Sequence, residues 1–203
     1  MKSEMNVCVG NVAQGSLTRS RTVGEEVKPK GRFVVEHWRN GKRINEFHFD
    51  NAVTTEGKNE GLNNIFKGAA GLASWYLGLI SSTGYTALAV TDVYAGINLA
   101  ANGWTEFAGY TDNLNAGNAT TRPVWNSGTV SAASLTSGSV SIFDITAAGT
   151  VKGLFAVGGT NSRTKSDATA GNTLWATALF SAGDVTVAIG DQLKVTYTVT
   201  MSS

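Results

Sequence analysis

Apolar and polar residues alternate along several short segments of the chain, most clearly near its end. From Leu193 to Met201 every second position is apolar and the positions between are polar. Side chains of a β-strand point alternately to opposite faces, so this pattern predicts a half-buried antiparallel strand over 191–201. Similar segments bounded by turn residues predict strands over 74–80, 103–110, 122–128, 128–135, 139–146, 149–159 and 174–180.

A hairpin is predicted over 32–50, where two strand-like segments flank the sequence RNGK. Asn40-Gly41 suits the positive φ angles of a tight two-residue turn. Alternation places Phe33, Val35 and His37 on one face of the first strand. Neither face of the hairpin is purely apolar, so contacts from both sides are expected.

The segment 51–68, NAVTTEGKNEGLNNIFKG, predicts one short helix. Thr54 or Thr55 can cap its N-terminus, and Leu62, Ile65 and Phe66 recur at helical spacing. Two glycines, Gly57 and Gly61, weaken the helix.

Composition supports an all-β fold. The chain has 203 residues, of which 24 are glycine and only 15% are charged, and no fixed-period repeat is present. The sequence predicts one antiparallel, jelly-roll-like β-sandwich over 31–203 with one short helix. Residues 1–30 lack sustained apolar periodicity and are expected to form an extended N-terminal arm, and the polar loop 160–172 is expected to be an exposed tip.

Charge argues against a nucleic-acid partner. Residues 1–67 hold 11 of the 16 Lys and Arg and 8 of the 15 Asp and Glu, so the rest of the chain carries 5 and 7. A face that neutralises several phosphates is not expected there. The first 20 residues lack the apolar core of a secretory signal, and no apolar run is long enough to cross a membrane. We therefore expect assembly inside a cell and no membrane partner.

The sequence offers few groups for catalysis or metal binding. Its two histidines, His37 and His48, fall in the two strands of the hairpin and are possible neighbours, but a zinc site needs three or four ligands. Cys8 is the only cysteine, and no nucleophile elbow is present. We expect no cofactor, no metal and no enzymatic activity.

The segment 103–125 is the richest in chemistry. It contains Trp104, Tyr110, Arg122 and Trp125, together with the carboxylates Glu106 and Asp112. Glycoside hydrolysis needs two carboxylates at a defined separation, and nothing in the sequence sets that separation. Sugar contact by the aromatic residues is an alternative. The favoured interpretation is that these residues close the edge of the sandwich and form an oligomer interface.

Several segments, in this order, resemble a group of small tailed-bacteriophage virion proteins. They are GRFVVEHWRNGKRINEFHFDNAVTTEGKNEGLNNIF, SWYLGLI, GWTEFAGYT with TRPVW, GTVKGLFAVGG, GNTLWATALF and GDQLKVTYTVTM, within residues 31–203. The resemblance implies a structural protein of the virion, in particular a capsid decoration (cement) protein that bridges neighbouring capsid subunits. It implies no catalytic residues.

The resemblance also implies the major capsid protein as partner and a homotrimer that fits a three-fold position. The arm is expected to order on assembly. Its apolar residues Val7, Val9, Val12 and Leu17 would contact the capsid, with Arg19 and Arg21 pairing with capsid carboxylates. The alternative function is a head-fibre or tail protein that contacts host-surface glycans, which exposure of Trp104 and Trp125 would favour.

Overall fold

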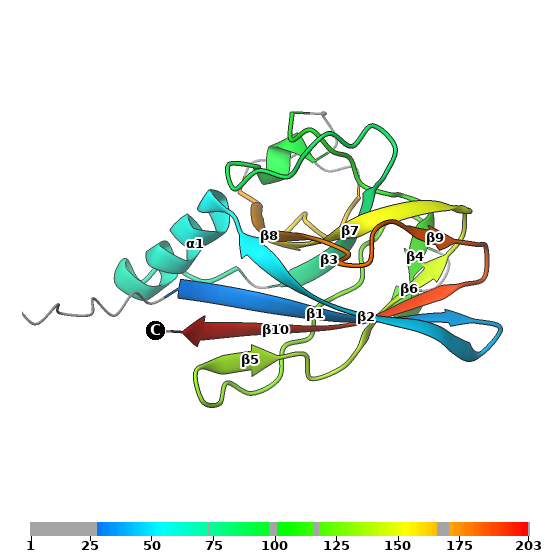
Figure 1. Cartoon of the computed structure of the whole chain (residues 1–203). Coiled ribbons are helices and arrows are strands. Elements are labelled where there is room, and N and C mark those ends of the chain that lie inside the picture. Colours follow the sequence, from blue (N-terminus) through cyan, green and yellow to red (C-terminus); the bar gives the residue numbers. More distant parts are fainter. Residues whose placement is uncertain (1–27, 73, 98–100, 116–117, 166–170, 203) are drawn as a thin grey trace, which may run out of the picture.

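The computed structural model describes residues 28–72, 74–97, 101–115, 118–165 and 171–202. These residues form antiparallel strands and one α-helix (Figure 1). In chain order the first elements are β1 (Lys28–Arg39), β2 (Lys42–Val53), α1 (Thr55–Phe66), β3 (Trp75–Ser81) and β4 (Tyr110–Asp112). The remaining strands are β5 (Ser134–Thr136), β6 (Ser141–Ile145), β7 (Gly149–Gly158), β8 (Thr173–Leu179), β9 (Val185–Val187) and β10 (Gln192–Ser202).

One curled sheet makes both layers of the fold. Its strand order is β3-β7-β8-β2-β1-β10-β6-β4, with β5 added to β10 and β9 added to β7. The long strand β2 pairs with β1 over most of its length but with β8 only at Ala52 and Val53. The sheet therefore folds over at the end of β2. The all-β, sandwich-like architecture with one short helix predicted from the sequence is confirmed.

The β1–β2 hairpin forms around the predicted turn. Asn40 and Gly41 have φ angles of 50° and 72°, as the two-residue turn requires. The face of β1 with Phe33, Val35 and His37 is buried, while the other face is only partly covered. β1 begins at Lys28, three residues before the predicted boundary, and residues 1–27 lie outside the described part of the chain.

The helix forms where it was predicted, but its apolar stripe faces outward. The Thr54 hydroxyl accepts a hydrogen bond from the Gly57 amide at 3.0 Å and caps the N-terminus. The helix lies on β8 through its glycines, because a Cβ on Gly57 would stand 2.5 Å from the carbonyl oxygen of Trp175. The three large apolar residues stay exposed: Leu62 by 53%, Ile65 by 61% and Phe66 by 78%.

Three predicted strands are wrong in extent. The segments predicted at 103–110 and 122–128 touch β3 only through single bridges, Glu106 with Ile80 and Val124 with Tyr76. They lie along the edge of β3 that β7 leaves free, so each covers a few backbone groups without forming a ladder. The segment predicted at 128–135 is mostly irregular and becomes β5 only at Ser134.

Two apolar clusters hold the layers together. The larger cluster lies between the two layers and includes Phe33, Val35, Leu154, Val195 and Tyr197. The smaller one lies on the other face of β3 and β7, under the long loops between β3 and β4. Its members are Tyr76, Ile80, Tyr94, Ile97, Trp104, Phe155, Val157 and Leu174. These loops therefore belong to the folded core.

Candidate functional site

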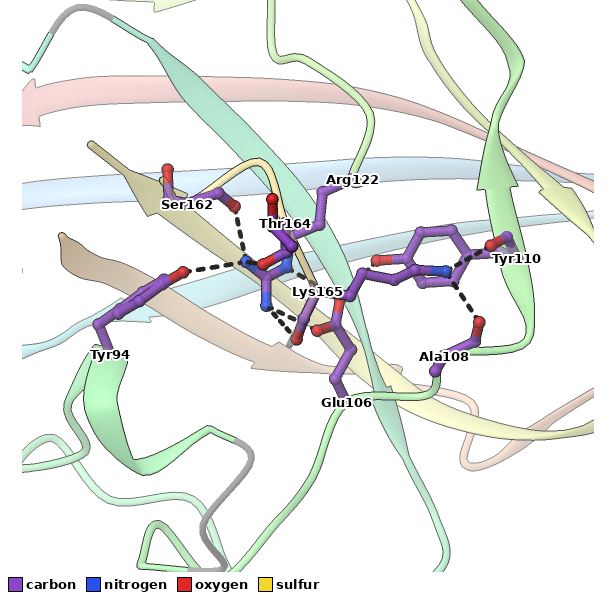
Figure 2. A network of polar contacts seen from close by, with 8 residues as sticks. All are labelled: Tyr94, Glu106, Ala108, Tyr110, Arg122, Ser162, Thr164 and Lys165. Atoms are coloured by element: carbon purple, nitrogen blue, oxygen red, sulfur yellow. Dashed lines mark hydrogen bonds and ion pairs between the residues drawn. The ribbon is translucent and has the colours of Figure 1, made fainter. Parts of the chain in front are cut away.

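Arg122 and Glu106 form an ion pair sealed inside the protein (Figure 2). The Arg122 Nη2 atom lies 2.6 Å from Glu106 Oε2, and Arg122 Nε lies 2.9 Å from Oε1. Almost none of either side chain reaches solvent. This two-point geometry is the strongest form of an arginine–carboxylate contact. It joins the two irregular segments that run along the free edge of β3.

The remaining donors of Arg122 bind a third segment. Its Nη1 atom donates to the carbonyl oxygens of Ser162 and Thr164 at 2.6 and 3.0 Å, and Nη2 donates to that of Lys165 at 3.2 Å. The prediction of an exposed tip at 160–172 is therefore wrong for its first half. These residues fold over the guanidinium because their carbonyl groups satisfy its donors.

Two more ionisable side chains complete the network. The Tyr110 hydroxyl donates to Glu106 Oε1 at 2.5 Å, and Lys165 Nζ donates to the carbonyl oxygens of Ala108 and Tyr110 at 2.9 and 2.6 Å. Burial and the nearby Glu106 carboxylate raise the pKa of Tyr110 well above its usual value. Burial lowers the pKa of Lys165. Burial also acts to lower the pKa of Arg122, but the charge and hydrogen bonds of Glu106 outweigh it, so that pKa is raised.

The network is built to hold segments together. Both oxygens of Glu106 accept hydrogen bonds from within the chain, and the carboxylate is shielded from water. A general acid or base must reach the proton that it transfers on a substrate. Glu106 as placed here has no such access, and its chemistry is that of an internal acceptor.

Asp112, the other candidate carboxylate, has partners of its own. It lies at the end of β4, just beyond the strand predicted over 103–110. Its Oδ1 atom accepts a hydrogen bond from the Leu114 amide at 3.1 Å, and Arg163 Nη2 lies 3.5 Å from Oδ2. Each of the two candidate carboxylates thus faces a different arginine.

The predicted interface residues in the described chain are interior residues. Trp104, Tyr110, Arg122 and Trp125 are all buried. Trp104 donates its indole N–H to Asp92 Oδ2 at 2.7 Å, and Trp125 donates to Ser137 Oγ at 2.9 Å. Their side chains leave almost no surface for a partner, which corrects the expectation that they form the contact themselves. Arg19 and Arg21 lie outside the described residues.

The two histidines do not form a pair. His37 is buried and its Nε2 atom lies 2.8 Å from Asp191 Oδ2, while His48 is exposed on the other face and lies 2.6 Å from Glu46 Oε1. The hairpin register matches His48 with Val34 and His37 with Asn45. Within the described residues, no group of three or more His, Cys, Asp or Glu side chains is placed to hold a metal ion.

An open apolar groove lies between α1 and β10, and the sequence did not predict it. Its volume is about 240 Å³, and the aromatic residues that line it are Trp75, Trp125, Trp175 and Tyr197. The Trp75 and Trp175 rings meet edge to face at 5.7 Å. No local sequence signal was available, because the four residues come from four distant segments that only the folded sheet brings together.

Comparisons with known proteins identify no family for this chain. No family model matches it, and no curated protein matches it significantly. In the parts of the chain that are described, every helix is too short or too polar to span a membrane.

Proposed function

We propose that this chain is a structural protein of a tailed-phage virion, specifically a capsid decoration (cement) protein that binds the major capsid protein and bridges neighbouring capsid subunits. The proposal builds on the ordered resemblance of residues 31–203 to such proteins. It also includes a homotrimeric state at three-fold positions of the shell and location in the virion.

One observation carries the proposal. The apolar residues Leu62, Ile65 and Phe66 form an exposed stripe on α1, while the polar residues of the 103–125 segment bond within the chain. A contiguous apolar patch on a protein surface marks a site of association. This combination is typical of a protein that acts by binding another protein through an apolar surface.

A decoration protein needs no catalytic group, because binding alone can stabilise the capsid. A protein that binds the assembled shell and not its separated subunits stabilises the shell by mass action. A contact of about 800 Å² per partner is enough for a specific complex, and repeated copies add avidity.

The alternative, a head-fibre or tail protein that contacts glycans, has less support. Exposed side chains at Trp104 and Trp125 would have favoured it, but both residues are buried. The tryptophans of the apolar groove also suit a pyranose poorly, because the indole N–H groups of Trp125 and Trp175 already donate within the chain. Sugar sites combine aromatic surfaces with precisely placed polar groups.

The test is binding to capsids assembled without this protein. We expect co-sedimentation of the chain to a fixed number of copies per shell, and a cryo-EM map with added density bridging subunits. The variant Leu62→Ser/Phe66→Ser should lose at least tenfold in affinity, because the transfer of two large apolar side chains contributes about 1.5–3 kcal/mol each. The matched control is Ile189→Ser, which removes an equally exposed apolar side chain far from α1 in the sequence. Absence of binding to capsids, or density only on the tail, would contradict the proposal.

A further inference from the structure

The apolar groove is the mouth of the space between the two layers. Successive inward-facing residues of β10 are Leu193, Val195 and Tyr197, which are fully buried, followed by Val199, which is only half-buried, and Met201, which is exposed. On the other side, α1 packs on β8 and leaves a gap to β10. The apolar face of β10 therefore continues past the point where the second layer ends.

The groove is lined by carbon surface. Trp125 and Trp175 use their indole N–H groups on Ser137 Oγ and on the Tyr197 hydroxyl, at 2.9 and 3.0 Å. The Tyr197 hydroxyl also accepts a hydrogen bond from Asn51 Nδ2 at 2.6 Å. Polar lining comes mainly from Glu60 and Asn64 at the helix side. The groove holds the volume of about eight liquid-water molecules, at ~30 Å³ each, and release of such water from apolar surface favours an apolar occupant.

The chain enters the fold beside this groove. β1 begins at Lys28, which pairs with Ser202, one residue beyond Met201. Figure 1 shows the start of β1 and the C-terminal end of β10 next to each other below α1. The 27 preceding residues are therefore attached at the rim of the groove.

Those residues contain one segment with the right pattern. In MNVCV, residues 5–9, the apolar Met5, Val7 and Val9 alternate with Asn6 and Cys8. An extended backbone would place the three apolar side chains on one face and Cys8 on the other. From Val9 to Lys28 there are 19 residues, which span up to roughly 63 Å at ~3.3 Å each, far more than is needed to return to the groove.

We propose that residues 5–9 of the same chain occupy the apolar groove between α1 and β10, with Met5, Val7 and Val9 directed inward and Cys8 at the open rim of the groove, beside α1. This docking completes the cover of Val199 and the exposed sides of Trp75 and Trp175. It assigns Val7 and Val9 to the chain's own core and leaves Arg19 and Arg21 in the connecting stretch, where they remain free to meet a capsid. It does not depend on the proposed function.

Cys8 provides a direct test, because it is the only cysteine. The full-length variant Asn64→Cys places a second thiol at the helix side of the groove, and Lys42→Cys places one on the hairpin at the opposite end of β1. The 20-residue tether from Cys8 to Lys28 spans up to roughly 66 Å and so allows either thiol to be reached without docking. Disulfide formation with oxidised glutathione is followed on non-reducing gels and by mass spectrometry.

Docking predicts an intrachain disulfide in Asn64→Cys that forms at least about tenfold faster than in Lys42→Cys, because binding raises the effective concentration above that of the free tether. Equal rates in the two variants would overturn the proposal. A predominant interchain dimer in Asn64→Cys would also overturn it and would assign the groove to the segment of a second copy.

Gly61 offers a way to fill the groove without disturbing the fold. A Cβ at this position meets only the Trp175 ring, at 3.9 Å, and Gly61 lines the groove. In the Asn64→Cys background, Gly61→Leu should reduce the rate to that of the Lys42→Cys control, while Gly61→Ala should leave it unchanged. An unchanged rate with Gly61→Leu would place the segment outside the groove and overturn the proposal.

The segment itself is tested by Val7→Asn/Val9→Asn in the Asn64→Cys background. Polar side chains at these positions should abolish the rate advantage, whereas Val23→Asn, in the connecting stretch, should preserve it. Equal rates for the two variants would show that the apolar pattern of residues 5–9 does not drive the contact, and would overturn the proposal.

Discussion

The Arg122 network and the apolar groove are two regions in which burial is opposite to the usual pattern. Ionisable side chains usually lie at the protein surface and apolar ones in the interior. The network contains an arginine, a glutamate, a lysine and a tyrosine, yet it is closed to solvent and its groups bond to one another. The groove is lined by tryptophans and a tyrosine, yet it is open. The polar groups of the network thus have their partners within the fold, whereas the apolar groove leaves carbon surface uncovered in the described structure.

The physical reason lies in what each region can tolerate. A buried charge without a partner is very costly, so the network must be complete in the folded chain by itself. An open apolar groove costs less, because water at an apolar surface is only moderately unfavourable per unit area. A protein can therefore leave apolar contacts for a later occupant far more easily than ionic ones.

Breaking the network should have the largest effect. Arg122→Met leaves Glu106 as a buried carboxylate without its cation, and we expect a loss of about 3–5 kcal/mol in the free energy of unfolding, measured with urea. Lys152→Met is the control, because Lys152 and its partner Asp184 both reach solvent, so the loss of this pair should cost about 1 kcal/mol or less. Similar losses for the two variants would mean that the network is not the closed centre described here.

The two helix glycines should differ in sign. Gly57→Ala drives a Cβ into the Trp175 backbone and should cost about 1–3 kcal/mol through overpacking. Gly61→Ala makes only an ordinary contact with the Trp175 ring, at 3.9 Å, and should be neutral or stabilising by up to about 1 kcal/mol, because alanine favours the helix. Urea unfolding of both variants measures the difference. A destabilised Gly61→Ala would show that the groove is closed at this point.

A second ionic cluster, at the end of β1 away from the groove, should be visible in acid. The hydrogen bonds from Arg39 hold the pKa of Asp191 well below its usual range, with the Ala188 amide and His37 adding to the effect. Because the pKa is lower in the folded state, the cluster stabilises the protein above about pH 4, the usual aspartate value, and is lost as the pH falls further.

Asp191→Asn tests this dependence. Over the range from about pH 4 to pH 2, the free energy of unfolding should fall less steeply in this variant than in the unmodified protein, because one proton-binding group is removed. Asp184→Asn is the control, since Asp184 forms an exposed ion pair with Lys152. Parallel pH profiles for Asp191→Asn and the unmodified protein would contradict the prediction.

The smallest effect is expected at the exposed helix stripe. Phe66→Ser should change the free energy of unfolding by no more than about 0.5 kcal/mol, because the Phe66 side chain is already in solvent. Thermal or urea unfolding measures it. A large destabilisation would show that another part of the chain covers Phe66, and the stripe would then not be available to a partner.

Several elements could be predicted because they depend on neighbours in the sequence. The Asn40-Gly41 turn follows from the φ angles that its two residues tolerate, and the Thr54 cap follows from one side chain that bonds to an amide three residues later. The alternation in β10 likewise needs only the two faces of a strand. Each of these signals is complete within a few residues.

The candidate site was predicted only as a list of residues. The sequence showed that Trp104, Glu106 and Arg122 are close along the chain, but not that Arg122 would bind Glu106 and the carbonyl groups of 162–165. The face of α1 that packs on the sheet could not be predicted either, because it depends on a contact with a distant segment. A helical apolar stripe predicts a buried face, but the close approach of Gly57 to Trp175 turns that stripe to solvent.

The sequence by itself determined the local periodicities: the strands, the tight turn, the helix and its cap, and the sandwich class that so many short strands require. Only the tertiary structure decided which groups are buried. The pairing of Arg122 with Glu106, and the meeting of Trp75, Trp125, Trp175 and Tyr197 at one groove, join residues from distant segments. Such contacts depend on how the sheet curls at β2, which is set by the packing of both layers at once and leaves no mark in any single stretch of sequence.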